Sequence, residues 1–389
     1  MAAPAKGACC LLLLLSVMTS PAHADIPDGL GLRLLAQLTP DLSQNQAISP
    51  FVISSLLTQM WLAAAGQTRK EIAKALGLKG SNKTAIAYNF LPSYRDAIED
   101  FSSQTNGAET GVMNQIYVRK GVSASSSFAQ LVRIIYNCTI RQFASSSQAA
   151  AEINAEVARV TWGRIQQLVD STSLEGLSVA LVSALYFKDQ WQWAFKRRPE
   201  LNFVTASGLK KVAMMEMRKE LRYTRFDTFD AVEIPYKDNR HCMLLLRPLG
   251  KNMTAVSELR SKLDSLQPRE ILESMSTRDT VVTMPPLKLE TTYSLRGALS
   301  RLGIRKLFTA GAELPMFSGM AITASDLYHK VFLEVNEKGT EAAAAGAVIL
   351  ARSASRDQPV LFYLDRPFFA IVFNKRYNFN VFSAYVASP

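Results

Sequence analysis

Side chains able to perform acid–base or metal chemistry are few in this 389-residue chain. Beyond the first 24 residues its histidines are His241 and His329, and no set of cysteines and histidines has the spacing of a metal site. The chain contains neither a Gly-x-Ser-x-Gly nucleophile elbow nor a glycine-rich phosphate loop. We therefore expect a protein that is not an enzyme and that carries neither a cofactor nor a metal.

The most unusual stretch lies near the C-terminus, in residues 334–356. A charged turn there precedes a run of small residues over 340–347. Read with the two-residue period of a strand, Thr340 and every second residue after it as far as Leu350 share one face, and Glu341 lies on the other. Such a run could enter a sheet as an extra strand where space is tight. An alanine-rich helix or a flexible loop is the alternative.

The sequence of residues 337–345, Glu-Lys-Gly-Thr-Glu-Ala-Ala-Ala-Ala, resembles the hinge of the reactive loop in the serpin family. In that family the loop is bait for a serine protease, and after cleavage it inserts into the main sheet. The loop would span about residues 337–360. The resemblance assigns the hinge to Glu337, Gly339, Thr340, Glu341, Ala342, Ala343, Ala344 and Ala345.

The same resemblance predicts where a protease would cut the loop. The commonest loop length in the family puts the reactive bond after Ser353, and a loop one residue shorter puts it after Arg352. Arg352 offers a cation to a trypsin-like pocket with a carboxylate at its base, whereas Ser353 offers little to any pocket. We therefore expect a trypsin-like serine protease to cut Arg352–Ser353 and to be trapped covalently. Ser353–Ala354 is the alternative bond, and cleavage after Arg356 would need a longer loop.

A serpin that has lost inhibition and acts as a carrier or chaperone is the competing function. Such members tend to carry bulky, charged or proline residues in the hinge. Over residues 339–345 only Glu341 is of that kind, and the family tolerates it.

The elements that would position this loop follow the serpin order from Asn45 to Tyr385 without a large insertion. The resemblance implies one domain, residues 25–389, with a mixed α/β (α+β) fold of three β-sheets, about nine helices and an exposed reactive-centre loop. Apolar periodicity and capping residues predict helices over 26–38, 52–65, 69–76, 85–101, 128–135, 149–168 and 293–302. Apolar or alternating runs predict strands over 112–118, 140–143, 181–188, 214–217, 231–236, 241–248, 281–290, 327–335, 364–373 and 380–385. In this scheme Thr68 can cap the helix that begins at residue 69.

In the serpin family a buried hydrogen-bonded cluster must rearrange before the main sheet opens. The resemblance assigns this cluster to Ser49, Ser183 and His329, and assigns the breach, the end of the sheet where the loop enters, to Trp191. Three positions depart from the family pattern. Val52 replaces a second serine, Ser183 an asparagine, and Asp189 a glycine.

The N-terminus predicts secretion. Five leucines at residues 11–15 and a small-residue site ending at Ala24 are typical of a signal peptide spanning 1–24, and no other apolar run is long enough to cross a membrane. Acceptor motifs for N-glycosylation stand at Asn82, Asn137 and Asn252. Two cysteines remain after the leader, Cys138 and Cys242, and they could be paired or be two buried thiols.

The formal net charge of +11 is concentrated in part on one segment. Charges of this kind usually form a solvated face, but they could also bind heparin or another sulfated glycosaminoglycan. The candidate residues are Lys196, Arg197, Arg198, Lys210 and Lys211. We expect no nucleic-acid or membrane partner and a monomeric protein.

Overall fold

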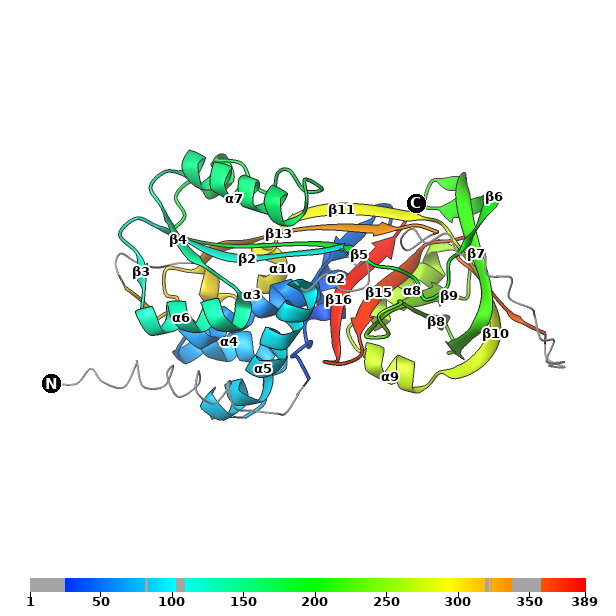
Figure 1. Cartoon of the computed structure of the whole chain (residues 1–389), viewed down its shortest axis with the longest axis horizontal. Coiled ribbons are helices and arrows are strands. Elements are labelled where there is room, and N and C mark those ends of the chain that lie inside the picture. The colour runs from blue at the N-terminus through cyan, green and yellow to red at the C-terminus, as the bar shows by residue number, and fades with distance from the viewer. Residues whose placement is uncertain (1–24, 81–82, 103–108, 319–321, 323, 338–357) are drawn as a thin grey trace.

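Two large β-sheets organise the fold (Figure 1). The computed structural model describes residues 25–80, 83–102, 109–318, 322, 324–337 and 358–389. The five-stranded sheet has the order β11–β13–β5–β2–β4. Its strands are β11 Leu287–Ser294, β13 Ala324–Val335, β5 Val179–Lys188, β2 Glu109–Arg119 and β4 Ile140–Phe143.

The nine-stranded sheet has the order β1–β16–β15–β9–β8–β7–β10–β14, and β6 also pairs with β7. Its strands are β1 Gln46–Ile48, β16 Phe379–Val386, β15 Phe368–Asn374, β9 His241–Pro248, β8 Phe229–Pro235, β7 Gly208–Arg225, β10 Ser276–Met284, β14 Val360–Tyr363 and β6 Lys196–Thr205. A third, two-stranded sheet joins β3 Ser123–Ala124 to β12 Phe317–Ser318.

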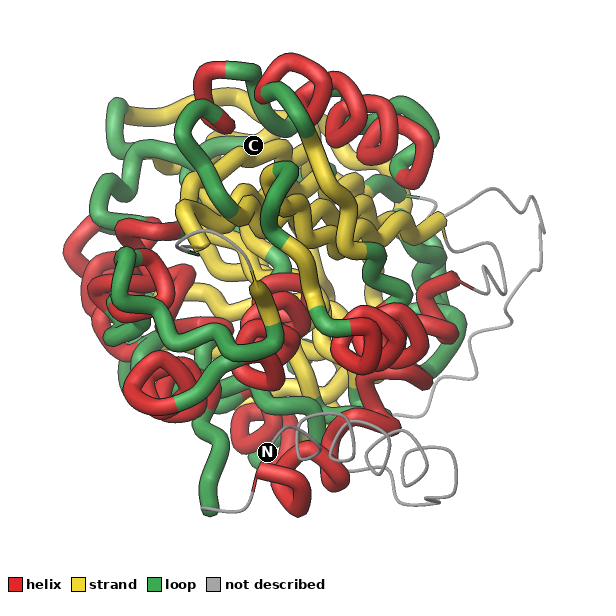
Figure 2. The backbone as a smooth tube through the Cα atoms, turned by 90° about the vertical axis from the view of Figure 1, so that its left-hand side faces the viewer, coloured by secondary structure: helices red, strands yellow, loops and turns green. Residues whose placement is uncertain are grey.

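Nine α-helices lie in the described part of the chain, and Figure 2 shows them around a core of strands. They are α2 Gly31–Leu38, α3 Pro50–Ala63, α4 Gly66–Leu76, α5 Lys83–Ser102, α6 Ser126–Tyr136, α7 Ser146–Val160, α8 Met253–Lys262, α9 Pro268–Glu273 and α10 Arg296–Arg301. None of the described helices is both long and apolar enough to span a membrane.

The five-stranded sheet is covered on both faces, which explains why β5 is apolar along nearly its whole length. One face packs against α7 through Ile153 and Val157, and these residues belong to a small separate apolar cluster. The other face packs against α3, every residue of which is buried. Figure 1 shows α7 on one side of the sheet and α3 on the other.

Several predicted boundaries were wrong for identifiable reasons. The run predicted as one strand over 281–290 divides at Pro285-Pro286 into β10 and β11, which belong to different sheets. The helix predicted over 149–168 ends at Val160, because Trp162 and Gly163, which follow the capping residue Thr161, adopt left-handed backbone conformations. The helix predicted over 293–302 is only α10, since Tyr293 still pairs with β13. The first helix begins at Gly31 rather than at residue 26.

The cap predicted for α4 is also different. The helix begins at Gly66, and its free N–H groups at Gln67 and Thr68 donate to the carboxylate of Glu313. The Thr68 hydroxyl accepts a hydrogen bond from the backbone N–H of Glu313 instead of capping the helix. A carboxylate distant in sequence thus replaces the local cap.

Candidate functional site

The central feature of the five-stranded sheet is the boundary between β5 and β13, which we call the seam. These two strands are parallel and stay in register from Asp326 opposite Ala180 to Leu333 opposite Phe187, after a register shift that separates this run from the pair Ala324–Val179. After β13 the chain enters residues 338–357 and returns as β14, at an edge of the nine-stranded sheet. The segment with the chemistry of interest therefore connects the two sheets.

Most of the predicted loop residues lie outside the described part of the chain. These are the hinge from Gly339 to Ala345, the predicted bond Arg352–Ser353 and the alternative bond Ser353–Ala354. Glu337 is described, and it lies at the end of the seam from which the loop departs.

Two residues that follow β5 hold this end of β13, and we call them the clamp: Trp191 and Phe195. The indole Nε1 of Trp191 donates to the carbonyl oxygen of Asn336 at 2.9 Å. The backbone N–H of Phe195 donates to the carbonyl oxygen of Glu337, also at 2.9 Å. The Trp191 ring stacks on Tyr236, with 4.5 Å between centroids and 10° between planes. The clamp thus fixes Asn336 and the first residue of the predicted hinge, Glu337.

An ion pair adds to the clamp. The Nε atom of Arg197 lies 2.7 Å from the Glu337 carboxylate. Sequence reasoning assigned Arg197 to a polysaccharide site. The structure places its side chain at the base of the loop, where it pairs with Glu337. Because this pair is exposed, its contribution to stability is small.

A buried cluster joins the middle of the seam to α3. Ser183 on β5 stands opposite His329 on β13, and the Ser183 Oγ and His329 Nδ1 atoms are 2.8 Å apart. The backbone N–H of Ser49 donates to His329 Nε2 at 2.9 Å. The Ser49 hydroxyl donates to the Val381 carbonyl and accepts a bond from the backbone N–H of Val52. The structure therefore brings the three predicted residues together, although Ser49 meets the histidine through its backbone.

These contacts define the state of the histidine. Since a backbone N–H can only donate, His329 Nε2 must accept, and the neutral ring carries its proton on Nδ1. That proton is donated to Ser183 Oγ, whose own hydroxyl can donate to the Tyr328 carbonyl at 3.5 Å. Complete burial lowers the pKa of His329 to about 3. A neutral imidazole therefore bridges β13, β5 and α3.

A second polar group lies beside the clamp. Asp189 follows β5, is only 6% exposed, and accepts a hydrogen bond from the N–H of Gln190. Burial and the neighbouring carboxylate of Asp238 raise the pKa of Asp189 to about 6. Burial is the largest single influence on Asp238 and acts in the same direction, but the hydrogen bonds from His241 and Arg240 and the electrostatic interaction with His241 together outweigh it and lower the pKa of Asp238 to about 2. This buried carboxylate is where the family pattern has a glycine.

Asp189, Asp238 and His241 are close enough to be considered as metal ligands, since their ligand atoms lie within 4.8 Å of one another. The ring of His241 is already committed, however. Its Nε2 accepts from the Asn374 amide, and the Asn374 oxygen is fixed by the backbone N–H groups of Arg376 and Tyr377. The proton is therefore on Nδ1, 2.7 Å from Asp238, and neither ring nitrogen offers a free lone pair to a metal.

The predicted basic residues lie along the hairpin formed by β6 and β7 and are all exposed. Lys196 stands opposite Glu216 and Lys211 opposite Asn202, so the two lysines are roughly 17 Å apart along the strands. Arg198 lies 3.4 Å from the Glu216 carboxylate. The hairpin therefore carries two separate basic groups rather than one.

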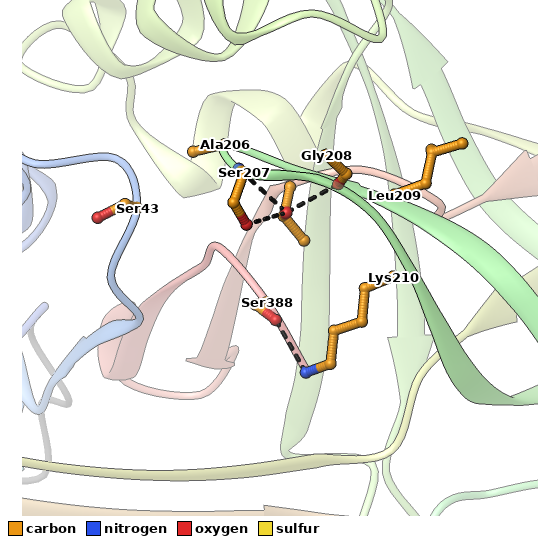
Figure 3. A pocket seen from close by; sticks show the side chains of 8 residues that line it. Ser43, Ala206, Ser207, Gly208, Leu209, Lys210 and Ser388 are labelled. Atoms are coloured by element: carbon orange, nitrogen blue, oxygen red, sulfur yellow. Dashed lines mark hydrogen bonds between the residues drawn. The ribbon is translucent and has the colours of Figure 1, made fainter.

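Lys210 lies at the far end of this hairpin. Figure 3 shows its Nζ atom directed at Ser388, with 3.1 Å to the hydroxyl oxygen. It also donates to the carbonyl oxygen of Pro389. Lys210 and Ser388 line a hollow of about 460 Å³, together with Ser43 and Thr205.

The predicted modification sites are distributed over the surface. Asn137 is exposed in a left-handed conformation at the end of α6, and Asn252 is exposed and caps α8 through its side-chain oxygen. Asn82 lies outside the described residues. Cys138 and Cys242 are both buried free thiols and do not pair.

Comparison with known proteins agrees with this geometry. The model of a family described as "Serpin (serine protease inhibitor)" matches residues 27–389. The chain belongs to the serpin family. Among its relatives, Iripin-2 of the tick Ixodes ricinus is 30% identical over 354 residues, covering 89% of this chain and 88% of Iripin-2. Antitrypsin of Bombyx mori is 30% identical and covers 83% of each chain.

Solved serpin structures confirm the predicted fold. The crystal structure of Manduca sexta Serpin-12 has a TM-score of 0.80 at 21% identity and covers 94% of this chain and 99% of its own. Native protease nexin-1 with heparin also has a TM-score of 0.80, at 22% identity, covering 97% and 100%. Uncleaved ovalbumin gives the same TM-score at 22% identity, covering 94% and 100%.

Sequence reasoning named Glu337 and Arg197 but missed that they pair, and it assigned no role to Tyr236 or Trp162. Tyr236 supports the clamp and Glu337 has Arg197 as a partner, neither of which has a local sequence signal. Trp162 follows α7 directly and carries a signal that could have been noticed, since a large aromatic residue precedes Gly163 where the helix ends.

Proposed function

We propose that this serpin is a secreted suicide-substrate inhibitor of trypsin-like serine proteases, cut at Arg352–Ser353. One observation carries the proposal. A closed parallel seam runs directly into a loop whose first residues, from Thr340 to Ala347, are nearly all small. The alternative, a carrier or chaperone without inhibitory activity, has no need for such a hinge.

The geometry of the seam gives insertion a driving force. A strand that turns back from the end of β13 would run antiparallel to β13 and also to β5. Insertion would therefore replace one parallel boundary by two antiparallel ones, which are somewhat more stable per residue. It would also add a complete ladder of backbone hydrogen bonds, so the uninserted state persists for kinetic reasons.

The chemistry is a partial protease reaction. The protease serine attacks the carbonyl carbon of Arg352, the bond to the nitrogen of Ser353 breaks, and the protease histidine supplies a proton to the leaving amine. This leaves an ester between Arg352 and the protease. If the freed strand enters the seam before water hydrolyses the ester, the attached protease is displaced and its active site is distorted.

The experiment that tests the proposal compares two adjacent substitutions. In Thr340→Arg the guanidinium faces the sheet interior, where an unpaired charge adds about 3 kcal/mol to the insertion barrier and slows insertion by roughly a hundredfold. In Glu341→Arg the same side chain faces water. We expect wild type and Glu341→Arg to form complexes with trypsin-like proteases that survive boiling in detergent, and Thr340→Arg to be released as a cleaved substrate. Trapping by Thr340→Arg with the wild-type stoichiometry, or no complex with any protease of the panel, would contradict the proposal.

A second proposal concerns heparin. The surplus of basic residues on the β6–β7 hairpin supports it, and the structural neighbour protease nexin-1 was solved with heparin. We expect Lys210→Ala combined with Lys211→Ala to reduce a heparin-dependent gain in inhibition rate at low salt, and high ionic strength to abolish that gain. An inhibition rate indifferent to heparin at low salt would remove the basis for this proposal.

Secretion belongs to the same proposal. The leader over residues 1–24 and the exposed positions of Asn137 and Asn252 support it. We expect mass spectrometry of the exported protein to show Asp25 as the first residue and glycan on at least one of Asn82, Asn137 and Asn252. An intact Met1 or a chain without glycan would argue against it.

A further inference from the structure

Trp162 is the most exposed tryptophan in the described part of the chain, and it lies where α7 meets the five-stranded sheet. Its side chain is 49% exposed. Its backbone is left-handed, with φ of 49°, and Gly163 follows with φ of 76°. This conformation is sterically disfavoured for a residue with a large side chain, whereas Asn tolerates it well. Trp162 therefore holds a backbone conformation that costs free energy, which suggests that its side chain has a role at this position.

The end of α7 is seated closely on the sheet at this point. A Cβ atom at Gly111 on β2 would lie 2.1 Å from the carbonyl oxygen of Val160, so only glycine allows the contact. The buried Thr161 closes the helix by donating to the Val157 carbonyl. Trp162 is therefore held next to the sheet by the two residues that precede it, Val160 and Thr161.

A row of residues leads from this point across the seam. Gly111 pairs with Tyr186 on β5, and Tyr186 pairs with Phe332 on β13. The Trp162 ring meets the Tyr186 ring edge-on, with 5.9 Å between centroids, and the Tyr186 and Phe332 rings are 5.6 Å apart. Three aromatic rings thus form a row from the end of α7 to β5 and on to β13.

Polar contacts fix the middle ring. The Tyr186 hydroxyl donates to the Glu109 carboxylate at 3.0 Å. The Arg164 guanidinium lies over the Tyr186 ring at 5.9 Å, and Lys288 lies over Phe332 at 5.7 Å. This face of the seam is opposite the face that holds His329, because residues three apart on a strand point to opposite sides.

We propose that Trp162 is a positioning residue that restrains opening of the seam by holding Tyr186 against Phe332. This inference rests on the proposed loop insertion. An inserted strand would separate β5 from β13 by one further strand spacing, about 4.8 Å, and would break the Tyr186–Phe332 contact. An aromatic pair of this kind contributes a factor of roughly 2 to 13 to a rate or equilibrium.

Two substitutions distinguish the effect of the Trp162 ring from the effect of its left-handed backbone. Trp162→Asn removes the ring and relieves the backbone, so we expect native stability to change little while the seam opens more easily. Trp162→Phe keeps a ring and the disfavoured backbone, so it should behave like the wild type. A residue with only a packing role would instead change stability and leave the rate of insertion unaltered. Phe332→Leu removes the Tyr186–Phe332 ring contact from the side of β13. It therefore tests the same contact even if the substitutions at residue 162 impair folding.

The experiment incubates the intact secreted protein below its unfolding temperature and follows conversion to a heat-stable form that trypsin no longer cuts in the loop. We expect Trp162→Asn and Phe332→Leu to convert roughly 3- to 10-fold faster than wild type, and Trp162→Phe to stay within about twofold. Tryptophan fluorescence should change on conversion in the wild type and change less in Trp162→Phe. The difference between the two proteins gives the signal of Trp162, one of the four tryptophans in the chain.

The outcomes distinguish this inference from the proposed function. A wild type that becomes heat-stable on loop cleavage while Trp162→Asn converts at the wild-type rate overturns the role of Trp162 alone. A wild type that gains no heat stability after cleavage overturns loop insertion, and the role of Trp162 with it.

Discussion

Ser183 and His329 face each other across the seam, and their hydrogen bond of 2.8 Å is the polar contact that joins the two parallel strands through their side chains. The Ser183 oxygen accepts the proton of a buried neutral imidazole. In the proposed mechanism, opening of the sheet must therefore break this contact. The stability of the seam should therefore depend on the Ser183 oxygen and on pH.

Ser183→Ala should lower the free energy of unfolding by about 1–3 kcal/mol, because it leaves the Nδ1–H group of His329 buried without an acceptor. It should also accelerate spontaneous conversion to the inserted form. Urea unfolding and the conversion assay measure the two effects. The exposed Ser265→Ala serves as the control and should change neither. A Ser183→Ala protein as stable as wild type would show that the Ser183–His329 hydrogen bond makes no net contribution to stability.

The stability contribution of His329 should depend on pH. Its folded pKa of about 3 lies below the unfolded value of 6.5, so between these values the unfolded chain binds a proton that the folded chain does not. This contribution is complete above pH 6.5 and is lost as pH falls toward 3, at up to about 1.4 kcal/mol per pH unit. His329→Gln should be less stable than wild type at pH 7.5 yet lose less between pH 7.5 and 5. Parallel pH curves for the two proteins would disprove this.

Trp191→Phe should weaken the clamp. The substitution keeps an aromatic ring on Tyr236 but removes the hydrogen bond to the Asn336 carbonyl. We expect a loss of about 0.5–1.5 kcal/mol in unfolding free energy and faster conversion to the inserted form. Trp193→Phe is the matched control, since the Trp193 ring contacts Lys219 and lies outside the clamp. Equal effects of the two substitutions would mean that the clamp does not hold the hinge.

Arg352→Ala should lower the rate at which trypsin-like proteases are trapped at least about a hundredfold, because the carboxylate in the protease pocket is then left unpaired. The fold should be unaffected, as thermal unfolding can verify. Arg356→Ala should leave trapping intact. Mass analysis of the cleaved loop gives the bond directly, and a new end after Ser353 or Arg356 would show that the predicted bond is wrong.

Much of the fold was predictable because its strands are continuous apolar runs. The run over 181–188 became β5 and the run over 241–248 became β9, since strands buried on both faces leave a plain signal. The errors occurred where a distant contact decides the local structure. Glu313 caps α4 from across the fold, and pairing with β13 extends β11 at the expense of the following helix.

The candidate site was predictable only in part. The resemblance to serpins indicated which residues belong together, but not that Ser49 would meet His329 through its backbone N–H. Nor could it indicate that Arg197 would pair with Glu337, because both side chains are long and their meeting depends on how the two sheets sit together. Trp162 went unnoticed since its role depends on Tyr186 and Phe332, which are distant in sequence and adjacent only in the sheet.

The pairing of β1 with β16 has a consequence for biosynthesis. Gln46 lies opposite Tyr385, and the last two strands, β15 and β16, lie inside the nine-stranded sheet between β1 and β9. A ribosome must therefore synthesise β15 and β16 before that sheet can close. Until then the nascent chain exposes two apolar strand edges, on β1 and on β9, so folding of this protein depends on protection from aggregation in the interval.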